Sequence, residues 1–418
     1  MIEVLRSLPA DAWLLFVTRF TRLFAYGALS VVLVFYLTAI GLSPAQVGTL
    51  LTLTLVGDTV ISLFLTTRAD RIGRRRMLVI GSVLMIGAGL TFAFTRNFLF
   101  LVIAGTVGVI SPSGNEVGPF LPIEQAALSH VIAGPRRTAV FAWYTLAGSF
   151  ATALGSLCGG GVSGLASGPV AGYRAVILLY AALGLLLALA FARLSPGTEV
   201  AAGESIAGKT LLGMGHSRKI VFQLSGLFAL DAFGGGFVVQ SFAAYWFYLR
   251  WGVSPATLGV VFFGANLLAG ISALLAVRLA ARFGLVRTMV FTHLPSNILL
   301  LLVPLMPTLP LAVAVLLARF SISQMDVPTR QAYTMAVVRP AERSAAAGIT
   351  GVARTIGASL APVLAGLLFA QPGLISYPFF IAGALKIVYD LLLYQRFVAR
   401  PTPVLTPVPA RAGAHHPR

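Results

Sequence analysis

The feature that most constrains this chain is a run of five arginines within residues 68–76, flanked by apolar stretches at 45–67 and 77–95. Each apolar stretch has about the twenty residues that a helix needs to cross the hydrocarbon core of a bilayer. Five arginines cannot enter hydrocarbon cheaply, so the run predicts a short hairpin between two membrane helices. Short loops rich in Lys and Arg stay on the cytoplasmic side. We therefore expect this hairpin to set the orientation of the chain.

The composition extends this prediction to the whole molecule. Of the 418 residues, 58% are hydrophobic and only 10% are charged, whereas soluble domains carry about 25% charged residues. The formal net charge of +18 invites a nucleic-acid interpretation, but bases in loops on one side of a membrane explain it better. We expect the lipid bilayer, and no nucleic acid, as a partner. The single cysteine, Cys158, excludes an internal disulfide framework.

Twelve membrane spans are predicted, each a helix because the bilayer offers no water to backbone groups. They run over 12–40, 45–67, 77–95, 98–131, 138–165, 171–193, 220–250, 254–278, 288–306, 309–338, 344–370 and 374–397. The fold class is an all-α polytopic membrane protein with twelve transmembrane helices in two pseudo-symmetric six-helix bundles. We expect the bundles over 1–193 and 220–397, a cytoplasmic linker over 194–219, and a disordered cytoplasmic tail over 398–418.

The distribution of basic residues supports the span count. An even number of spans puts both termini on one side, and 21 of the 30 Lys and Arg residues fall on the side that holds residues 68–76. The opposite side holds only Arg96, Arg174 and Arg250. Because of this bias we expect both termini in the cytoplasm and the protein in the plasma (inner) membrane. The first span is long enough to remain in the membrane rather than be cleaved as a signal peptide.

The two halves of the chain repeat each other weakly. Residues 41–45, GLSPA, recur as residues 252–256, GVSPA, at an offset of 211. Further pairs at that offset are Gly48 with Gly259, Arg71 with Arg282, and Gly73 with Gly284. Residues 124–126 match 330–332 at an offset of 206. These collinear matches predict a duplication of six spans, and parallel repeats place a substrate site near the midplane between the halves.

In its twelve spans, its central polar connection and the loop after its second span, the chain resembles the major facilitator superfamily of secondary transporters. The family pattern in that loop is Gly, three residues, Asp, a basic residue, any residue, Gly and further basic residues. The matching residues are Asp70, Arg71, Gly73, Arg74 and Arg75. Thr66 stands in place of the first Gly, and Arg68 at a usually apolar position. The resemblance implies alternating access by rocking of two halves, with this loop locking the outward-facing state.

The chemistry of the loop fits a gate. A carboxylate at a helix end, such as that of Asp70, can meet helix dipoles or arginines of the other half. Contacts that form in one state only would bias a two-state equilibrium. In the alternative interpretation the arginines only set the topology and meet anionic lipid.

Ionisable side chains within the spans are candidates for the transport site, because each costs at least about 2.5 kcal/mol on insertion scales. We assign the following residues to the substrate and proton pathway: Arg19, Arg22, Asp58, Glu116, Glu124, Asp231, Asp326, Arg330, Gln331 and Arg354. At the repeat offset Asp231 falls next to Arg19, so we expect it to pair with Arg19 and Arg22. His293 is expected to be a satisfied interior histidine outside the cavity lining.

Spans four and ten are expected to be broken helices, because prolines interrupt residues 111–119 and 326–331. Broken backbone at membrane depth is buried in protein or lines a cavity, and equivalent breaks in two halves point to a transport site. Glu124 and Arg330 occupy matching repeat positions, so we expect them to approach across the pseudo-two-fold axis, either as an ion pair between the halves or with substrate between them. Alternatively, Asp326 and Arg330, four residues apart, neutralise each other and bind nothing.

These features predict a secondary active transporter of a small solute. Arginines in the cavity suit an anionic or zwitterionic substrate. Burial favours a neutral carboxyl group and a nearby arginine favours a charged one, so Glu116, Glu124 and Asp231 are candidates to carry a proton. The loop pattern favours proton-coupled efflux by antiport. Proton symport, passive uniport and a non-transporting membrane sensor are the alternatives.

Nothing in the sequence predicts an enzyme. The three glycines at 159–161 lack the Lys and Ser or Thr of a phosphate-binding loop, so ATP-driven pumping is unsupported and no cofactor is expected. The adjacent His415 and His416 are interpreted as solvated tail residues, so no metal site is expected. A monomer suffices for this architecture.

Overall fold

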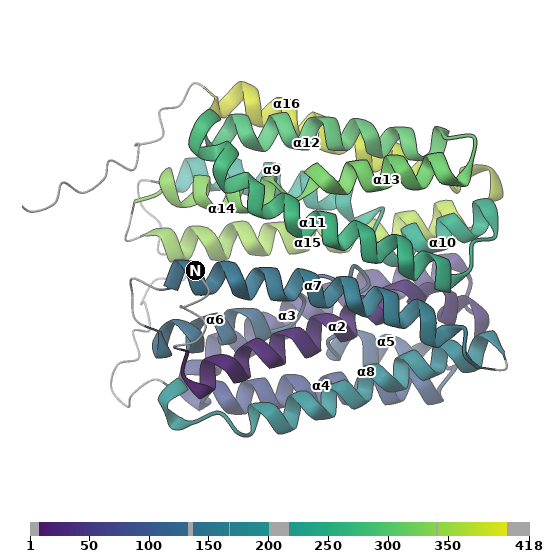
Figure 1. The fold of residues 1–418 in the computed structure, drawn as a ribbon, viewed down its shortest axis with the longest axis horizontal. Helices are drawn as coiled ribbons and strands as arrows, with labels where there is room; N and C mark the ends of the chain where they lie inside the picture. The colour runs from purple at the N-terminus through teal and green to yellow at the C-terminus, as the bar shows by residue number, and fades with distance from the viewer. Residues whose placement is uncertain (1–7, 133–136, 167, 200–216, 340–341, 399–418) are drawn as a thin grey trace, which may run out of the picture.

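The computed structural model describes residues 8–132, 137–166, 168–199, 217–339 and 342–398. Among these residues every regular element is a helix, and eleven helices are long and apolar enough to cross a membrane. The helices form an N-terminal and a C-terminal bundle that lie side by side (Figure 1). The predicted all-α architecture is therefore confirmed. Residues 200–216 of the predicted linker and 399–418 of the predicted tail lie outside the described residues.

Each half contains the six predicted spans. The helices of the N-terminal half are α2 (Ala10–Ala39), α3 (Pro44–Ile72), α4 (Arg74–Phe94), α5 (Phe98–Val107), α6 (Phe120–Val131), α7 (Arg137–Ser163) and α8 (Pro169–Phe191). Those of the C-terminal half are α9 (Arg218–Gly236), α10 (Gln240–Trp251), α11 (Pro255–Phe283), α12 (Leu285–Leu302), α13 (Leu309–Ser323), α14 (Asp326–Ala336), α15 (Arg343–Phe369) and α16 (Tyr377–Phe397). Short 3-10 turns lie at Pro196–Thr198, Val303–Leu305 and Pro372–Leu374.

Three spans are broken in the middle. The span predicted at 98–131 consists of α5 and α6, and the span predicted at 309–338 consists of α13 and α14, so both predicted breaks are confirmed. A third break lies between α9 and α10. It follows the glycines 234–236, for which the sequence alone allows either helix packing or a hinge. In the structure Gly234 and Gly236 do pack closely, against the backbone carbonyls of Ala382 and Ala358.

The repeat is visible at both ends of the bundles. We call the end that holds Gly73 and Gly284 the basic end, and the end that holds Gly41 and Gly252 the opposite end. All four glycines have positive φ, at 111°, 85°, 106° and 66° respectively, a conformation that glycine adopts without a Cβ clash. Ser43 and Ser254, which follow the second pair closely, cap α3 and α11 through their hydroxyl groups. Equivalent turns therefore reverse the chain in both halves.

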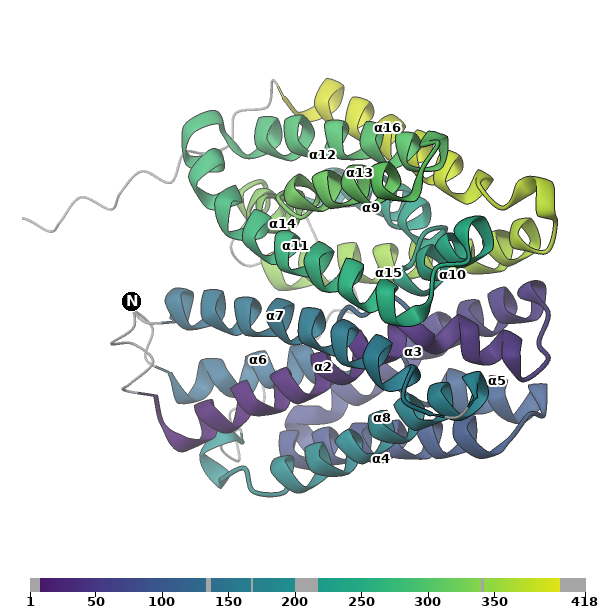
Figure 2. The same ribbon diagram turned by 45° about the vertical axis from the view of Figure 1, so that its right-hand side comes forward.

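Two glycine seams join the halves at the opposite end. In α3 and α15 a Cβ built on Gly48 would lie 2.9 Å from Cα of Gly366, and in α7 and α11 one on Gly160 would lie 2.8 Å from Cα of Gly259. Gly48 and Gly259 are repeat mates, so the two seams are equivalent under the pseudo-two-fold. In Figure 2 α7 and α11 converge toward the opposite end and separate toward the basic end. The structure is therefore closed at the opposite end.

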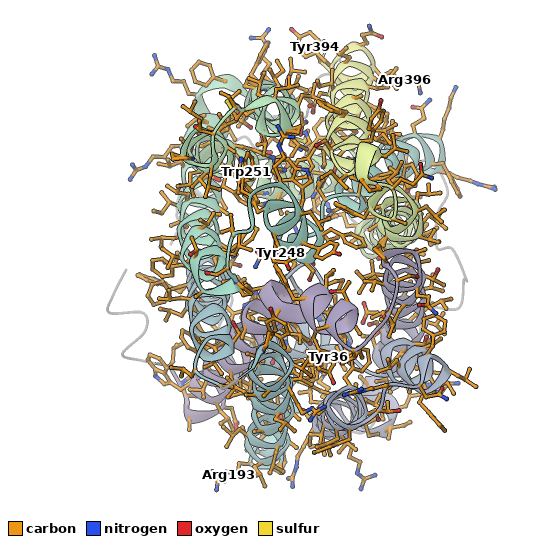
Figure 3. All side chains as sticks on the ribbon, turned by 90° about the vertical axis from the view of Figure 1, so that its right-hand side faces the viewer. Tyr36, Arg193, Tyr248, Trp251, Tyr394 and Arg396 are labelled. Atoms are coloured by element: carbon orange, nitrogen blue, oxygen red, sulfur yellow. The ribbon has the colours of Figure 1, made fainter. Side chains whose placement is uncertain are left out.

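The outer surface suits lipid. Large apolar side chains that are at least half exposed include Val60, Leu63, Phe64, Val83, Phe94, Leu99 and Phe291. Figure 3 views the helices from the opposite end and shows Arg193 and Arg396 at the periphery of the two halves. Large apolar side chains exposed along helices that are long enough to span a membrane are expected to face the acyl chains of the bilayer.

Adding a side chain to one seam should open it. Gly160→Val is expected to push α7 away from α11, because a Cβ at position 160 would lie 2.5 Å from the carbonyl oxygen of Pro255. The neighbouring Gly161→Val is the matched control, since a Cβ there meets nothing within 4 Å. Spin labels at Leu165 and Arg250, in a variant without Cys158, should report a longer distance for Gly160→Val only. Equal distances in both variants would contradict the role of the seam.

Candidate functional site

A cavity of about 840 Å³ lies between the two halves. Its walls come from both bundles, and its ionisable lining residues are Arg19, Glu116, Asp231, Arg319, Arg354 and Lys386. Uncharged polar groups on the walls include Asn115, Gln125, Gln240, Asn266, Gln324 and Gln331. The lining includes Phe141 near the start of α7 and Val277 near the end of α11, both toward the basic end. The cavity thus extends from the glycine seams toward the basic end.

The N-terminal wall contains a fully buried ion pair. Nη1 and Nη2 of Arg22 donate to the two carboxylate oxygens of Glu124 at 2.6 and 2.8 Å, and neither side chain is exposed. Glu124 also accepts hydrogen bonds from the hydroxyl groups of Thr18, at 3.1 Å, and Tyr144, at 2.5 Å. The bidentate geometry and the extra donors are what a buried carboxylate requires to remain ionised.

Glu116 extends this network to the cavity. It accepts hydrogen bonds from Nε and Nη2 of Arg22 at 3.3 and 3.1 Å, and Nη1 of Arg19 lies 2.5 Å away but outside hydrogen-bond geometry. Gly148 makes room for Arg19, because a Cβ there would lie 2.7 Å from its Nε. The four side chains carry two positive and two negative charges, so the network is neutral without any bound proton. We call it the N-terminal network.

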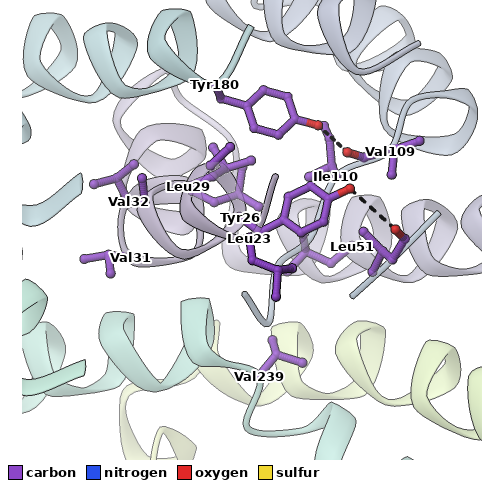
Figure 4. Packing of buried hydrophobic residues seen from close by; sticks show 14 of the residues in the cluster. Leu23, Tyr26, Leu29, Val31, Val32, Leu51, Val109, Ile110, Tyr180 and Val239 are labelled. Carbon is purple, nitrogen blue, oxygen red and sulfur yellow. Dashed lines mark hydrogen bonds between the residues drawn. The ribbon is translucent and has the colours of Figure 1, made fainter. Parts of the chain in front are cut away.

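The backbone that connects α5 to α6 is held by side chains. The carbonyls of Val109, Val117 and Gly114 accept from the hydroxyl groups of Tyr180, Tyr26 and Thr152 respectively (Figure 4 shows the first two tyrosines). Ser111 donates to the carbonyl of Asn115 at 2.7 Å. Ser241 of the other half donates to the carbonyl of Pro112 through both its amide and its hydroxyl group. Polar backbone without helical partners is thereby satisfied, as burial demands.

Asp58 also binds the segment between α5 and α6, at a position that does not line the cavity. It is buried at 7% exposure and receives hydrogen bonds from the backbone amide of Gly118 and the hydroxyl group of Ser62. No basic side chain of the described residues forms an ion pair with it at 4.0 Å or less. The structure thus places Asp58 away from the other predicted pathway residues.

The C-terminal wall contains a larger network, which we call the C-terminal network. Asp231 of α9 lies 2.6 Å from Nζ of Lys386 and 3.3 Å from Nη1 of Arg330. Arg330 also donates to Asp326 at 2.7 Å, one turn earlier on α14. His293 lies between Asp231, 3.7 Å from Nε2, and Asp390, 2.8 Å from Nδ1. Asn297 donates to the second oxygen of Asp390 at 2.9 Å.

Two predicted contacts between the halves are wrong. Glu124 does not approach Arg330, because Arg22 saturates Glu124 and the two aspartates saturate Arg330. Asp231 does not pair with Arg19 and Arg22, because Lys386 and Arg330 lie closer to it within its own half. The i,i+4 pairing of Asp326 with Arg330, the alternative interpretation, is confirmed. His293 is hydrogen-bonded inside the protein, as expected.

Two cavity arginines have no acidic partner. Within the described residues no carboxylate lies within 4.0 Å of the guanidinium of Arg319 or Arg354, and Nε of each is buried without a hydrogen bond. Both line the cavity, as does Gln331. The guanidinium of Arg319 makes a cation–π contact with the ring of Phe320, with its Cζ 5.0 Å from the ring centre. An anion in the cavity would therefore find two guanidinium groups with free donors.

Uncharged groups make the polar contacts across the midplane. Gln240, the first residue of α10, donates to the hydroxyl groups of Ser30 and Ser156 at 2.8 and 3.1 Å. Asn266 of α11 donates to Gln240 and to Ser156 at 3.1 and 3.3 Å. Because no charge is separated when such bonds break, they suit an interface that opens and closes.

The loop between α3 and α4 is bound within its own half. The carboxylate of Glu199, after α8, accepts hydrogen bonds from the backbone amides of Arg74 and Arg75 at 2.7 and 3.0 Å, and so caps α4. The side chain of Arg74 reaches the carbonyl of Thr198 at 3.1 Å. Arg71 is exposed, and the side chain of Asp70 lies outside the described residues. The expected contact of Asp70 with the other half stays a prediction.

Sequence reasoning missed several members of these networks. Asp390 and Lys386 lie in the last span, where an isolated acid and base four residues apart signal buried ionic contacts. Arg319 lies inside the span predicted at 309–338 but is not among the residues assigned to the pathway. Gln240 and Asn266 gave no signal beyond being polar within apolar stretches.

Two helical bundles with lipid-facing exteriors, joined at one end around a polar cavity, define a membrane transport protein. The sequence model of the Major Facilitator Superfamily matches residues 15–249 and 224–417. The chain belongs to the major facilitator superfamily, whose members are transporters and not enzymes. It therefore moves a small solute across a membrane.

Individual relatives agree with this assignment. The chain is 30% identical to the uncharacterized membrane protein YJR124C of Saccharomyces cerevisiae over 93% of this chain and 94% of the relative. Its fold is similar to that of a mutant of the nucleoside transporter NupG, with a TM-score of 0.75 and 14% identity over 93% and 100% of the two chains. It is also similar to the D-xylose–proton symporter, with a TM-score of 0.72 and 16% identity over 92% and 97%.

Breaking the buried Arg22–Glu124 pair from one side should harm stability more than removing both residues. Glu124→Leu leaves a buried guanidinium short of a carboxylate, at a cost of about 3–5 kcal/mol. In Arg22→Leu/Glu124→Leu the uncompensated charge is gone while Arg19 still meets Glu116, so much of the loss should be recovered. Thermal unfolding of the purified protein, followed by tryptophan fluorescence, measures both. A double variant less stable than Glu124→Leu would contradict this account.

Proposed function

We propose that this protein is a secondary active transporter that moves a small anionic or zwitterionic solute by alternating access, coupled to protons. The observation that carries the substrate class is the pair Arg319 and Arg354, whose guanidinium groups face the cavity without an acid. Guanidinium groups hold carboxylate and phosphate groups through charge-assisted hydrogen bonds. The neutral N-terminal network offers Asn115 and Gln125 for the polar part of the solute.

The proposed orientation follows the basic residues. With the basic end in the cytoplasm, both termini are cytoplasmic and the cavity described above belongs to an inward-facing state. The membrane we propose is the plasma (inner) membrane. In that state Glu199 occupies the amides at the start of α4. We propose that the loop of Asp70, Arg71, Gly73, Arg74 and Arg75 exchanges partners when the basic end closes, and so gates the cavity. A single chain provides both halves of the site.

Two coupling modes remain as proposals. The resemblance of the loop favours efflux by proton antiport. The charges of the cavity favour the second candidate, uptake by proton symport, because an anion at Arg319 and Arg354 and a proton on a neighbouring group stabilise each other. A counterflow screen in proteoliposomes with small carboxylates, phosphates and amino acids first identifies a solute. The direction in which a pH gradient drives that solute then distinguishes the modes. Antiport drives solute toward the acidic side of an imposed pH gradient, and symport drives it toward the alkaline side.

Removing one cavity arginine should weaken solute binding. Arg319→Gln and Arg354→Gln each delete charge-assisted hydrogen bonds of about 1.5–3 kcal/mol, which corresponds to at least about a tenfold loss of affinity. Counterflow in proteoliposomes measures the half-saturating concentration of the solute that the screen identifies. Arg250→Gln, which removes the same charge from the exposed end of α10, is the control and should leave it unchanged. Equal values in all variants would exclude Arg319 and Arg354 from the site.

A further inference from the structure

The C-terminal network contains a histidine between two aspartates, one layer of side chains behind the wall of the cavity. Asp231 and Lys386 line the cavity, and His293 and Asp390 lie behind them. We propose that the imidazole of His293 carries the coupling proton, which it takes up when an anionic solute occupies Arg319 and Arg354. This inference rests on proton symport, the second coupling mode proposed above, and names the group that performs it.

The hydrogen bonds of His293 determine which nitrogen binds the proton. Nδ1 lies 2.8 Å from Oδ1 of Asp390, and an ionised carboxylate only accepts hydrogen bonds, so Nδ1 carries its hydrogen in either state. The amide nitrogen of Asn297, which also lies 3.1 Å from Nδ1, donates to the other oxygen of Asp390 at 2.9 Å and holds that carboxylate in place. Nε2 then has the free lone pair, 3.7 Å from Oδ1 of Asp231. A proton from cavity water adds to Nε2 and returns to water when the cavity opens on the other side.

The charges of the two networks differ by one. In the N-terminal network two arginines and two glutamates cancel. In the C-terminal network Arg330 and Lys386 face Asp231, Asp326 and Asp390, which leaves one negative charge while His293 is neutral. A proton on Nε2 cancels it. The glutamates of the N-terminal network need no proton, so His293 replaces them as the carrier.

The unpaired arginines explain why the proton and the solute arrive together. The groups that surround His293 are Asp231 on α9, Arg330 on α14, and Lys386, Tyr389 and Asp390 on α16. Arg319 on α13 and Arg354 on α15 add two positive charges at the cavity, which oppose protonation while it is empty. An anion that binds them removes this opposition, since the interaction of charges in a poorly solvated site is strong.

Magnetic resonance of the ring nitrogens tests the proposal without knowledge of the solute. A chain in which the other four histidines, His130, His216, His415 and His416, are replaced by Gln keeps one imidazole. In nanodiscs at pH 7, Arg354→Gln and Lys386→Gln should increase the doubly protonated fraction of His293, and Asp390→Asn should decrease it. Arg396→Gln, an exposed base on the same helix as Lys386, is the matched control and should not change it. A fraction that does not respond to the three network variants would overturn the proposal.

Transport then separates this inference from the function on which it rests. With a solute identified by counterflow, His293→Gln should retain exchange but lose at least tenfold of the accumulation driven by a pH gradient. If the unmodified protein accumulates no solute in a pH gradient, proton coupling itself is wrong. If it accumulates solute toward the acidic side, it is an antiporter and the joint binding of proton and solute is wrong. If it accumulates solute toward the alkaline side and His293→Gln accumulates as much, His293 is not the carrier.

Discussion

The structure depends on ion pairs that, in the described part of the chain, form inside each half and not between the halves. An apolar interior without water cannot leave a guanidinium or a carboxylate unpaired at low cost, and under the alternating access proposed above the two halves must move apart. Arg22 therefore meets Glu116 and Glu124 within the N-terminal bundle, and Arg330 meets Asp231 and Asp326 within the C-terminal bundle. The halves touch through glycine seams and neutral hydrogen bonds of Gln240 and Asn266. Rocking then breaks contacts that are weak and leaves intact those that are strong.

The same requirement applies to the backbone. Where α5 ends and α6 has not begun, carbonyl groups have no helical partner, and hydroxyl groups from α2, α7, α8 and α10 supply one. Four helices thus converge on one irregular segment and fix the position of Glu116 at the cavity wall. Asp58 belongs to this support, since it binds the amide of Gly118. Irregular backbone at membrane depth is tolerable here because protein surrounds it.

The duplication preserved geometry and changed chemistry. Equivalent glycines form both seams, and equivalent turns reverse both halves. The first helix of the N-terminal half supplies bases, Arg19 and Arg22, whereas the first helix of the C-terminal half supplies an acid, Asp231. Packing constrains small residues alike in both copies, because a Cβ at either seam meets backbone. The cavity side chains carry no such constraint, and one network is neutral while the other is unbalanced. In the function proposed above, the C-terminal half therefore handles both the anion and the proton.

The sequence by itself determined that the chain is a two-bundle helical membrane protein, where its spans lie, and that α5–α6 and α13–α14 are broken. Hydropathy, arginine placement and proline are local signals, and the bilayer makes their consequences nearly obligatory. Only the tertiary structure decided which charges meet. Glu124 and Arg330 match in the repeat yet bind different partners, and His293 and Asp390 come from helices far apart in the sequence. Repeat symmetry relates positions in two copies, whereas distance in the folded chain depends on helix packing, which the spacing of residues does not encode.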